Sequence, residues 1–175
     1  GRPWVRVKLA ASLDGRSALA NGASQWITGE EARHDVQRLR ARSSAILTGI
    51  GTILADNPRL TVRVGDATRP PLRVILDTRL RTPPNARLFE APGEVLVLTT
   101  ANFAASEVAA RAAALEKCGA RIEAMSSAAP ENSVQSRWVD LHAALARLAE
   151  LEVNEVLVEA GPTLAGEFVR QALAD

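Results

Sequence analysis

Short apolar runs separated by helical segments constrain the fold of this chain most strongly. The runs occupy residues 45–49, 73–77, 94–100, 120–125 and 155–159. Apolar runs of this length are typical of strands that are covered on both faces. Helical patterns are found at 103–118, at 139–151 and from about Thr163 onward. The alternation of strand and helix predicts an α/β layered sheet that is mostly parallel.

The beginning of the chain has a different pattern. Apolar and basic residues alternate over 5–12, which predicts a half-buried strand whose Lys8 points away from the core. Residues 13–16 contain Asp-Gly, a pair that tolerates positive φ, and are typical of a turn. A short strand over Ser17–Ala20 would complete a hairpin with the first strand.

A helix and two loops can also be predicted. Thr28 and Glu31 have the spacing of a capping box, which predicts a helix that runs to about Arg42. The proline-rich stretch 78–93 is predicted to be a connecting loop, and residues 126–138 a surface excursion before a helix.

Size, charge and residue types exclude several classes of protein. A chain of 175 residues with 47% apolar residues is expected to form one domain. Its net charge of +1 provides no broad basic field for nucleic acid or an anionic membrane. No apolar stretch approaches the ~20 residues of a membrane span, and no signal-peptide pattern is present, so we expect a cytoplasmic protein. One cysteine and two histidines form no zinc-binding cluster, so no metal is expected.

Two glycine-containing turns follow predicted strands. Residues 49–54, GIGTIL, resemble a dinucleotide fingerprint without its third glycine, and they could equally form a plain turn. In VEAGPTLAGEF, residues 158–168, Glu159 ends a buried strand where α/β sheets place ligands. Free amides at Gly161 and after it would suit a phosphate. The alternative is a strand end with a proline-initiated helix and a solvated Glu159.

Two further clusters allow a functional and a structural interpretation. Asp56 and Arg63 could bind a sugar phosphate, or could belong to an ordinary turn with a surface ion pair. Trp26 could be a core anchor, or could offer an aromatic plane to a flat heterocycle beside Ser24 and Gln25.

For the remaining polar residues, a role on the solvated surface has to be weighed against a catalytic one. Lys8 is either a solvated side chain or a functional one. His34 and His142 are predicted to be surface residues, because both lie in amphipathic helices at exposed-looking positions. No nucleophile elbow or Walker phosphate loop is present.

Four stretches together resemble the reductase domain of the bifunctional riboflavin-biosynthesis deaminase-reductase. They are VKLAASLDGRSALANGASQWIT, ARHDVQRLRARSSAILTGIGTILADNPRLTVR, PLRVILD and VEAGPTLAGEF. The resemblance implies a dihydrofolate-reductase-like fold, with a mixed, mostly parallel sheet flanked by helices. It also implies NADPH-dependent reduction of 5-amino-6-(5-phosphoribosylamino)uracil to the ribitylamino compound.

The resemblance also implies roles for particular residues. The catalytic candidates are Lys8 and Asp56. The residues expected to hold the substrate are Ser24, Arg40, Leu60, Arg63 and Glu159. The residues expected to hold NADPH are Ala10, Trp26, Thr52, Asp56, Gly161, Pro162, Thr163, Leu164, Ala165, Gly166 and Glu167.

The chain departs from the family pattern in two respects. The zinc ligands of the deaminase domain are absent from it, so residues 1–175 are expected to form a single reductase domain without deaminase activity. Family members continue past the last helix, so we expect this domain to be incomplete at its C-terminus. The resemblance implies a homodimer. The alternatives are a reductase of a related diaminopyrimidine or pterin, and a nucleotide-binding or dimerisation module without turnover.

Overall fold

The computed structural model describes residues 1–21, 24, 26–64, 69–127 and 138–175. Its strands are Trp4–Lys8 (β1), Ala45–Gly49 (β2), Leu72–Leu76 (β3), Val95–Thr99 (β4), Ala120–Ala124 (β5) and Glu155–Glu159 (β6). Its helices are Glu30–Arg42 (α1), Ile50–Asp56 (α2), Ser106–Lys117 (α3), Leu141–Glu150 (α4) and Pro162–Arg170 (α5), with a 3₁₀ turn at Arg87–Glu90 (η1). The strands predicted at 45–49 and 155–159 have the bounds that were expected.

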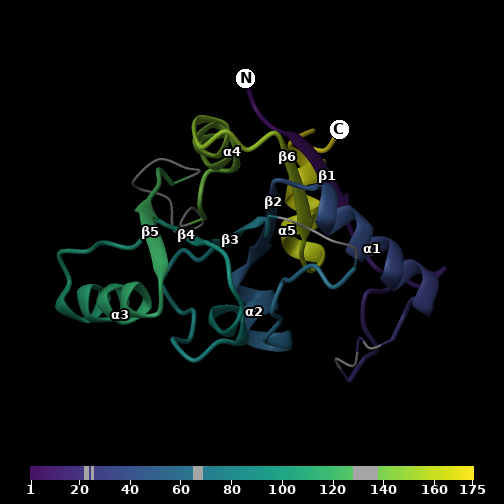
Figure 1. Cartoon of the computed structure of the whole chain (residues 1–175), viewed down its shortest axis with the longest axis horizontal. Coiled ribbons are helices and arrows are strands. Elements are labelled where there is room, and N and C mark those ends of the chain that lie inside the picture. The colour runs from purple at the N-terminus through teal and green to yellow at the C-terminus, as the bar shows by residue number, and fades with distance from the viewer. Residues whose placement is uncertain (22–23, 25, 65–68, 128–137) are drawn as a thin grey trace.

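The six strands form one sheet in the order β1-β6-β2-β3-β4-β5. Each neighbouring pair in this sheet is parallel. β1 and β6 are far apart in the sequence and lie side by side (Figure 1). The predicted α/β fold with a mostly parallel sheet is therefore confirmed.

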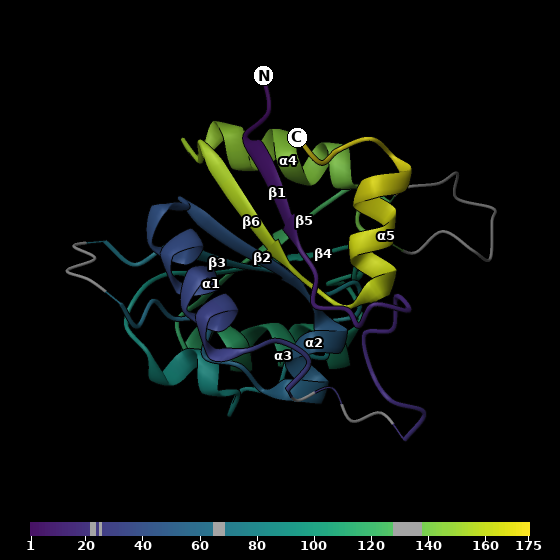
Figure 2. The same cartoon turned by 90° about the vertical axis from the view of Figure 1, so that its right-hand side faces the viewer.

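Helices cover both faces of the sheet (Figure 2). Successive strand residues point to opposite faces, so Ile46 and Leu47 on β2 belong to different apolar clusters. The cluster of Leu47 also contains Leu145 from α4 and Phe168 from α5. The cluster of Ile46 contains residues from α2, α3 and η1. The sheet is thus the middle layer of three, and all its strands end at the same edge.

The predicted hairpin at the start of the chain is wrong. The turn itself forms, because Gly15 adopts a φ of +80° and its N–H donates to the carbonyl of Ser12 at 2.9 Å. Residues 17–20 form no strand, and β1 pairs with β6 instead. Val5 and Val7 of β1 pack into the same cluster as Val156 and Val158 of β6, and this distant pairing outweighs a local one.

The predicted capping box is also wrong. The N-cap of α1 is Gly29, and within the described ranges no side chain caps this end of the helix. The carbonyl of Thr28 accepts a hydrogen bond from Nη1 of Arg33 at 2.6 Å. The helix therefore begins one residue later than the motif indicates, although it ends at Arg42 as expected.

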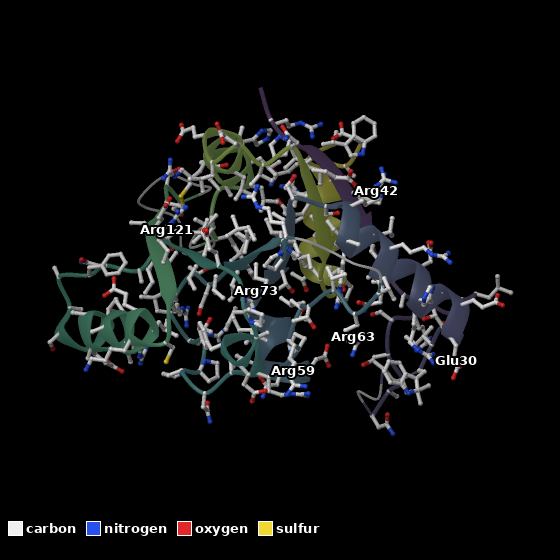
Figure 3. The ribbon with its side chains drawn as sticks, in the orientation of Figure 1. Glu30, Arg42, Arg59, Arg63, Arg73 and Arg121 are labelled. Carbon is white, nitrogen blue, oxygen red and sulfur yellow. The ribbon has the colours of Figure 1, made fainter. Side chains whose placement is uncertain are left out.

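The connection over 78–93 is irregular as predicted, apart from η1. The buried Asp77 carboxylate holds one end of it by accepting the N–H and the hydroxyl of Thr82, at 2.7 and 2.8 Å. The buried Arg73 guanidinium holds the other end by donating to the carbonyl of Gly93 at 2.6 Å (Figure 3). Burial lowers the pKa of Arg73. Most of the predicted excursion at 126–138 lies outside the described residues.

Candidate functional site at the carboxyl edge of the sheet

The neighbouring strands β2 and β6 send their following helices to opposite faces of the sheet. α2 packs through Ile53 on one face, and α5 packs through Phe168 on the other. A Cβ added at Gly49, where β2 ends, would lie 3.3 Å from Cδ2 of Leu164 in α5. The starts of both helices therefore lie close together. In open α/β sheets, such a point of reversal at the carboxyl edge is where ligands bind.

A largely buried ion pair joins two of the predicted substrate residues at this edge. Nε and Nη2 of Arg40 donate to the two carboxylate oxygens of Glu159, at 2.5 and 2.8 Å. The side chains are only 12% and 11% exposed. Nη1 of Arg40 donates to the carbonyl of Thr61 at 2.9 Å. Glu159 is therefore held by α1 rather than solvated at a strand end.

The sheet places two more polar residues beside Glu159. Lys8 at the end of β1 pairs directly with Glu159, so both side chains leave the same face of the sheet. Thr48, the next-to-last residue of β2, follows Leu47, which pairs with Val158, and its side chain therefore leaves that face as well. The hydroxyl of Thr48 is fully buried and has no hydrogen-bond partner among the described residues. Sequence patterns did not single out Thr48, because a threonine in a strand is unremarkable.

The segment after α2 carries two predicted substrate residues. It turns through Asn57 and Leu60, which adopt φ values of 41° and 51°. Leu60 is buried in the cluster that contains Ile53, so its side chain packs in the core. Arg63 is exposed, and in the view of Figure 3 it lies between α1 and α2. Its backbone N–H donates to Oε1 of Gln37 at 3.0 Å.

Two other predicted residues lie on α2. Thr52 is half-buried near the start of the helix, and Asp56 is exposed at its last residue. At a rise of ~1.5 Å per residue, Asp56 lies roughly 9 Å along the axis from the first residue of the helix. The geometry pairs Lys8 with Glu159 and places Asp56 away from the strand ends. The catalytic roles of Lys8 and Asp56 stay predictions.

The start of α5 has free backbone amides. Gly161 is its N-cap, Pro162 follows, and no side chain of the described residues caps this end. Along the predicted cofactor segment, Leu164 and Ala165 face the core, whereas Gly161, Pro162, Thr163 and Gly166 are exposed. Hydrogen bonds from Arg170 and Gln171 lower the pKa of Glu167 to about 2. Glu167 therefore bonds to its own helix.

The remaining predicted residues lie between β1 and α1. Ala10 and Ser24 are half-buried, and Trp26 is 71% exposed, so the prediction of Trp26 as a core anchor is wrong. The Arg33 guanidinium lies 4.5 Å from the centroid of the Trp26 ring. One face of the indole is thus occupied by a cation from α1. Gln25, the other predicted hydrogen-bonding residue of this loop, lies outside the described residues.

The other surfaces of the described structure carry fewer groups that could take part in catalysis or binding. His34 and His142 are exposed, as predicted. An open groove of about 470 Å³ lies beside α1, which lines it with His34, Arg38 and Arg42. Within the described ranges, no group of His, Cys, Asp and Glu could hold a metal ion. In the same part of the chain, no helix is long and apolar enough to span a bilayer.

Known proteins are similar to this chain in sequence and in fold. Over 187 residues the chain is 37% identical to the riboflavin biosynthesis protein RibD of Escherichia coli, covering all of this chain and 47% of that protein. The structure of Acinetobacter baumannii RibD matches with a TM-score of 0.78 at 37% identity, over 99% of this chain and 44% of that one. These matches confirm the predicted dihydrofolate-reductase-like fold.

A Thermotoga maritima structure is also similar. That protein is described as a diaminohydroxyphosphoribosylaminopyrimidine deaminase/5-amino-6-(5-phosphoribosylamino)uracil reductase, and it matches with a TM-score of 0.71 at 34% identity over 99% of this chain and 43% of that one. The chain thus spans about half the length of the curated relatives it matches. The family model for the RibD C-terminal domain matches residues 3–175. Since this match covers nearly every residue, the chain belongs to the RibD C-terminal domain family.

Proposed function

We propose that this chain uses NADPH to reduce the ribose of 5-amino-6-(5-phosphoribosylamino)uracil to a ribityl chain. The observation that carries the proposal is the reversal point between β2 and β6, where the Arg40–Glu159 pair lies beside the uncapped start of α5. Similarity to the Thermotoga maritima protein, whose name includes this reductase activity, supports the choice of substrate. Cytoplasmic location and a homodimer belong to the same proposal.

The residues present fit a dinucleotide phosphate. The start of α5 has free amides and the positive end of a helix dipole, and in the described part of the chain no side-chain cap competes there with a phosphate. Gly161, Thr163 and Gly166 are exposed there and would hold the phosphate-bearing part of NADPH. Trp26, with Arg33 on one side of its ring, would hold a flat ring of the cofactor.

The chain's own residues would bind and orient the sugar. Arg63, whose guanidinium can fork onto phosphate oxygens, would bind the ribose phosphate. Glu159 would accept hydrogen bonds from sugar hydroxyls while Arg40 keeps its carboxylate in place. When bound, NADPH supplies a hydride for C1′ of the ring-opened sugar.

The reduction requires one proton in addition to the hydride. The C1′ to nitrogen double bond becomes a single bond, and the nitrogen takes a proton. Lys8, at the end of β1, could deliver this proton from Nζ. Asp56 is the other candidate donor. Much of the rate would come from positioning rather than from acid catalysis.

The test follows NADPH absorbance after addition of freshly generated substrate. We expect substrate-dependent oxidation by the unmodified protein and its loss in Arg63→Ala. Arg121→Ala is the matched control, because Arg121 is an exposed arginine on β5 at the other edge of the sheet (Figure 3). If NADPH is oxidised only when a related diaminopyrimidine or pterin is added, that compound replaces the proposed substrate. Binding of NADPH without oxidation would favour a module without turnover.

A further inference from the structure

Gln37 is a buried polar residue that is not among the predicted site residues. It lies on α1 and is only 7% exposed. A buried amide is costly unless it is hydrogen-bonded, so its partner shows what the residue does. That partner is the backbone N–H of Arg63, at 3.0 Å from Oε1.

Gln37 and Arg40 hold the same short segment from one face of α1. Residues three apart on a helix are neighbours on its surface. Arg40 donates to the carbonyl of Thr61, and Gln37 accepts from the N–H of Arg63, so the segment is held at two points two residues apart. On its other side, the buried side chain of Leu60 anchors it in the core.

This arrangement fixes the backbone position from which the Arg63 side chain extends. After Asn57, the C-cap of α2, residues 58–63 are outside helix and strand, so the regular hydrogen bonds of these elements do not hold them. Arg63 is exposed, and a long arginine side chain has many rotamers in solvent. Fixing its backbone restricts the positions that the guanidinium can reach.

We propose that Gln37 is a positioning residue that aims Arg63 at the phosphate of a sugar-phosphate substrate. The proposal rests on the proposed function for the ligand class, and on the Gln37 to Arg63 hydrogen bond for the mechanism. Gln37 touches no ligand itself. Its effect therefore appears in the binding of phosphorylated ligands and depends on the Arg63 side chain.

Three variants separate positioning from general stability. Gln37→Met keeps the length of the side chain and removes the acceptor, whereas Gln37→Glu keeps an acceptor oxygen. Arg38→Met is the control on the same helix, because Arg38 is exposed and lies outside the site. We expect Gln37→Met to raise KM roughly two- to tenfold, as the loss of one neutral hydrogen bond implies, with kcat little changed. Arg38→Met should stay close to the unmodified protein, and Gln37→Glu, which keeps the acceptor, should retain a lower KM than Gln37→Met.

A double-mutant cycle gives the decisive comparison. In an Arg63→Ala background, Gln37→Met should cause no further loss, because the two residues act as one unit. The same cycle is measured by calorimetric titration with ribose 5-phosphate, which requires no turnover. Additive losses, or equal losses for ribose without its phosphate, would overturn the proposal.

The two readouts distinguish the proposals. If substrate is reduced but Gln37→Met leaves KM and ribose 5-phosphate affinity unchanged, the positioning role is wrong and the reductase stands. If no substrate is reduced but ribose 5-phosphate binds through Arg63 and is weakened by Gln37→Met, the positioning role stands and the reductase is wrong. Failure of ribose 5-phosphate to bind, or binding that does not depend on Arg63, would reject the positioning role.

Discussion

Replacing Glu159 by glutamine should destabilise the protein markedly. The change keeps the shape of the side chain and removes the charge that faces Arg40. Both side chains are about one-tenth exposed, so water can compensate the guanidinium only in part. Two charge-assisted hydrogen bonds, at 2.5 and 2.8 Å, lose their ionised acceptor.

The expected magnitude follows from burial. Breaking a fully buried ion pair from one side costs about 3–5 kcal/mol. Arg40 keeps its hydrogen bond to the carbonyl of Thr61, and the glutamine oxygen can still accept one bond, so we expect a loss of about 2–3 kcal/mol. For a domain of this size, that corresponds to a decrease in Tm of roughly 4–12 °C.

Glu155 provides a matched control on the same strand and the same face. It pairs with Arg6 and Arg42, and the side chains of these three residues are 18%, 28% and 57% exposed. Partly exposed pairs contribute little, so Glu155→Gln should cost about 1 kcal/mol or less. The double variant Arg40→Met/Glu159→Leu removes both charges. Its free energy of unfolding should stay within about 1 kcal/mol of that of the unmodified protein.

The free energy of unfolding is measured by urea titration, followed by circular dichroism, for the unmodified protein, the two single variants and the double variant. The slope of free energy against urea should be equal among them, so that midpoints can be compared. A loss in Glu159→Gln no larger than in Glu155→Gln would refute the reasoning from burial. A double variant as unstable as Glu159→Gln would show that the unpaired charge is not the cause.

Three further outcomes are expected. Thr48→Val removes a hydroxyl without a partner among the described residues, so the free energy of unfolding in urea should stay constant or rise by up to about 1 kcal/mol; a loss above that would reveal a hidden hydrogen bond. In a protein whose other tryptophans are replaced by phenylalanine, Arg33→Gln should lower the fluorescence anisotropy of Trp26, and an unchanged value would contradict the stacked geometry. The pKa of Glu167 should be near 2 by carboxyl NMR, and Arg170→Gln should raise it. Because this pKa is lowered on folding, the stabilisation is present above about pH 4.5, the ordinary value for Glu, and is lost as pH falls toward 2.

The candidate site was only partly predictable. The residues that end β6 and begin α5 could be identified, because a carboxylate followed by glycine and proline is a local pattern. That Glu159 would pair with Arg40 was not predictable, since 119 positions separate the two residues and both were expected to face substrate. Gln37 was missed because a glutamine in a polar helix carries no signal until its partner, the Arg63 backbone, is known.

The sequence by itself determined the elements whose cause is local. Apolar runs produced β2 and β6 with the expected bounds, and Gly119 after α3 adopts a φ of +89° as a helix end requires. Tertiary structure alone decided which strands are neighbours. β1 pairs with β6 rather than with residues 17–20, because burying its valines against distant ones is worth more than a local turn. That pairing brings Lys8 beside Glu159, and so the site exists only in the folded chain.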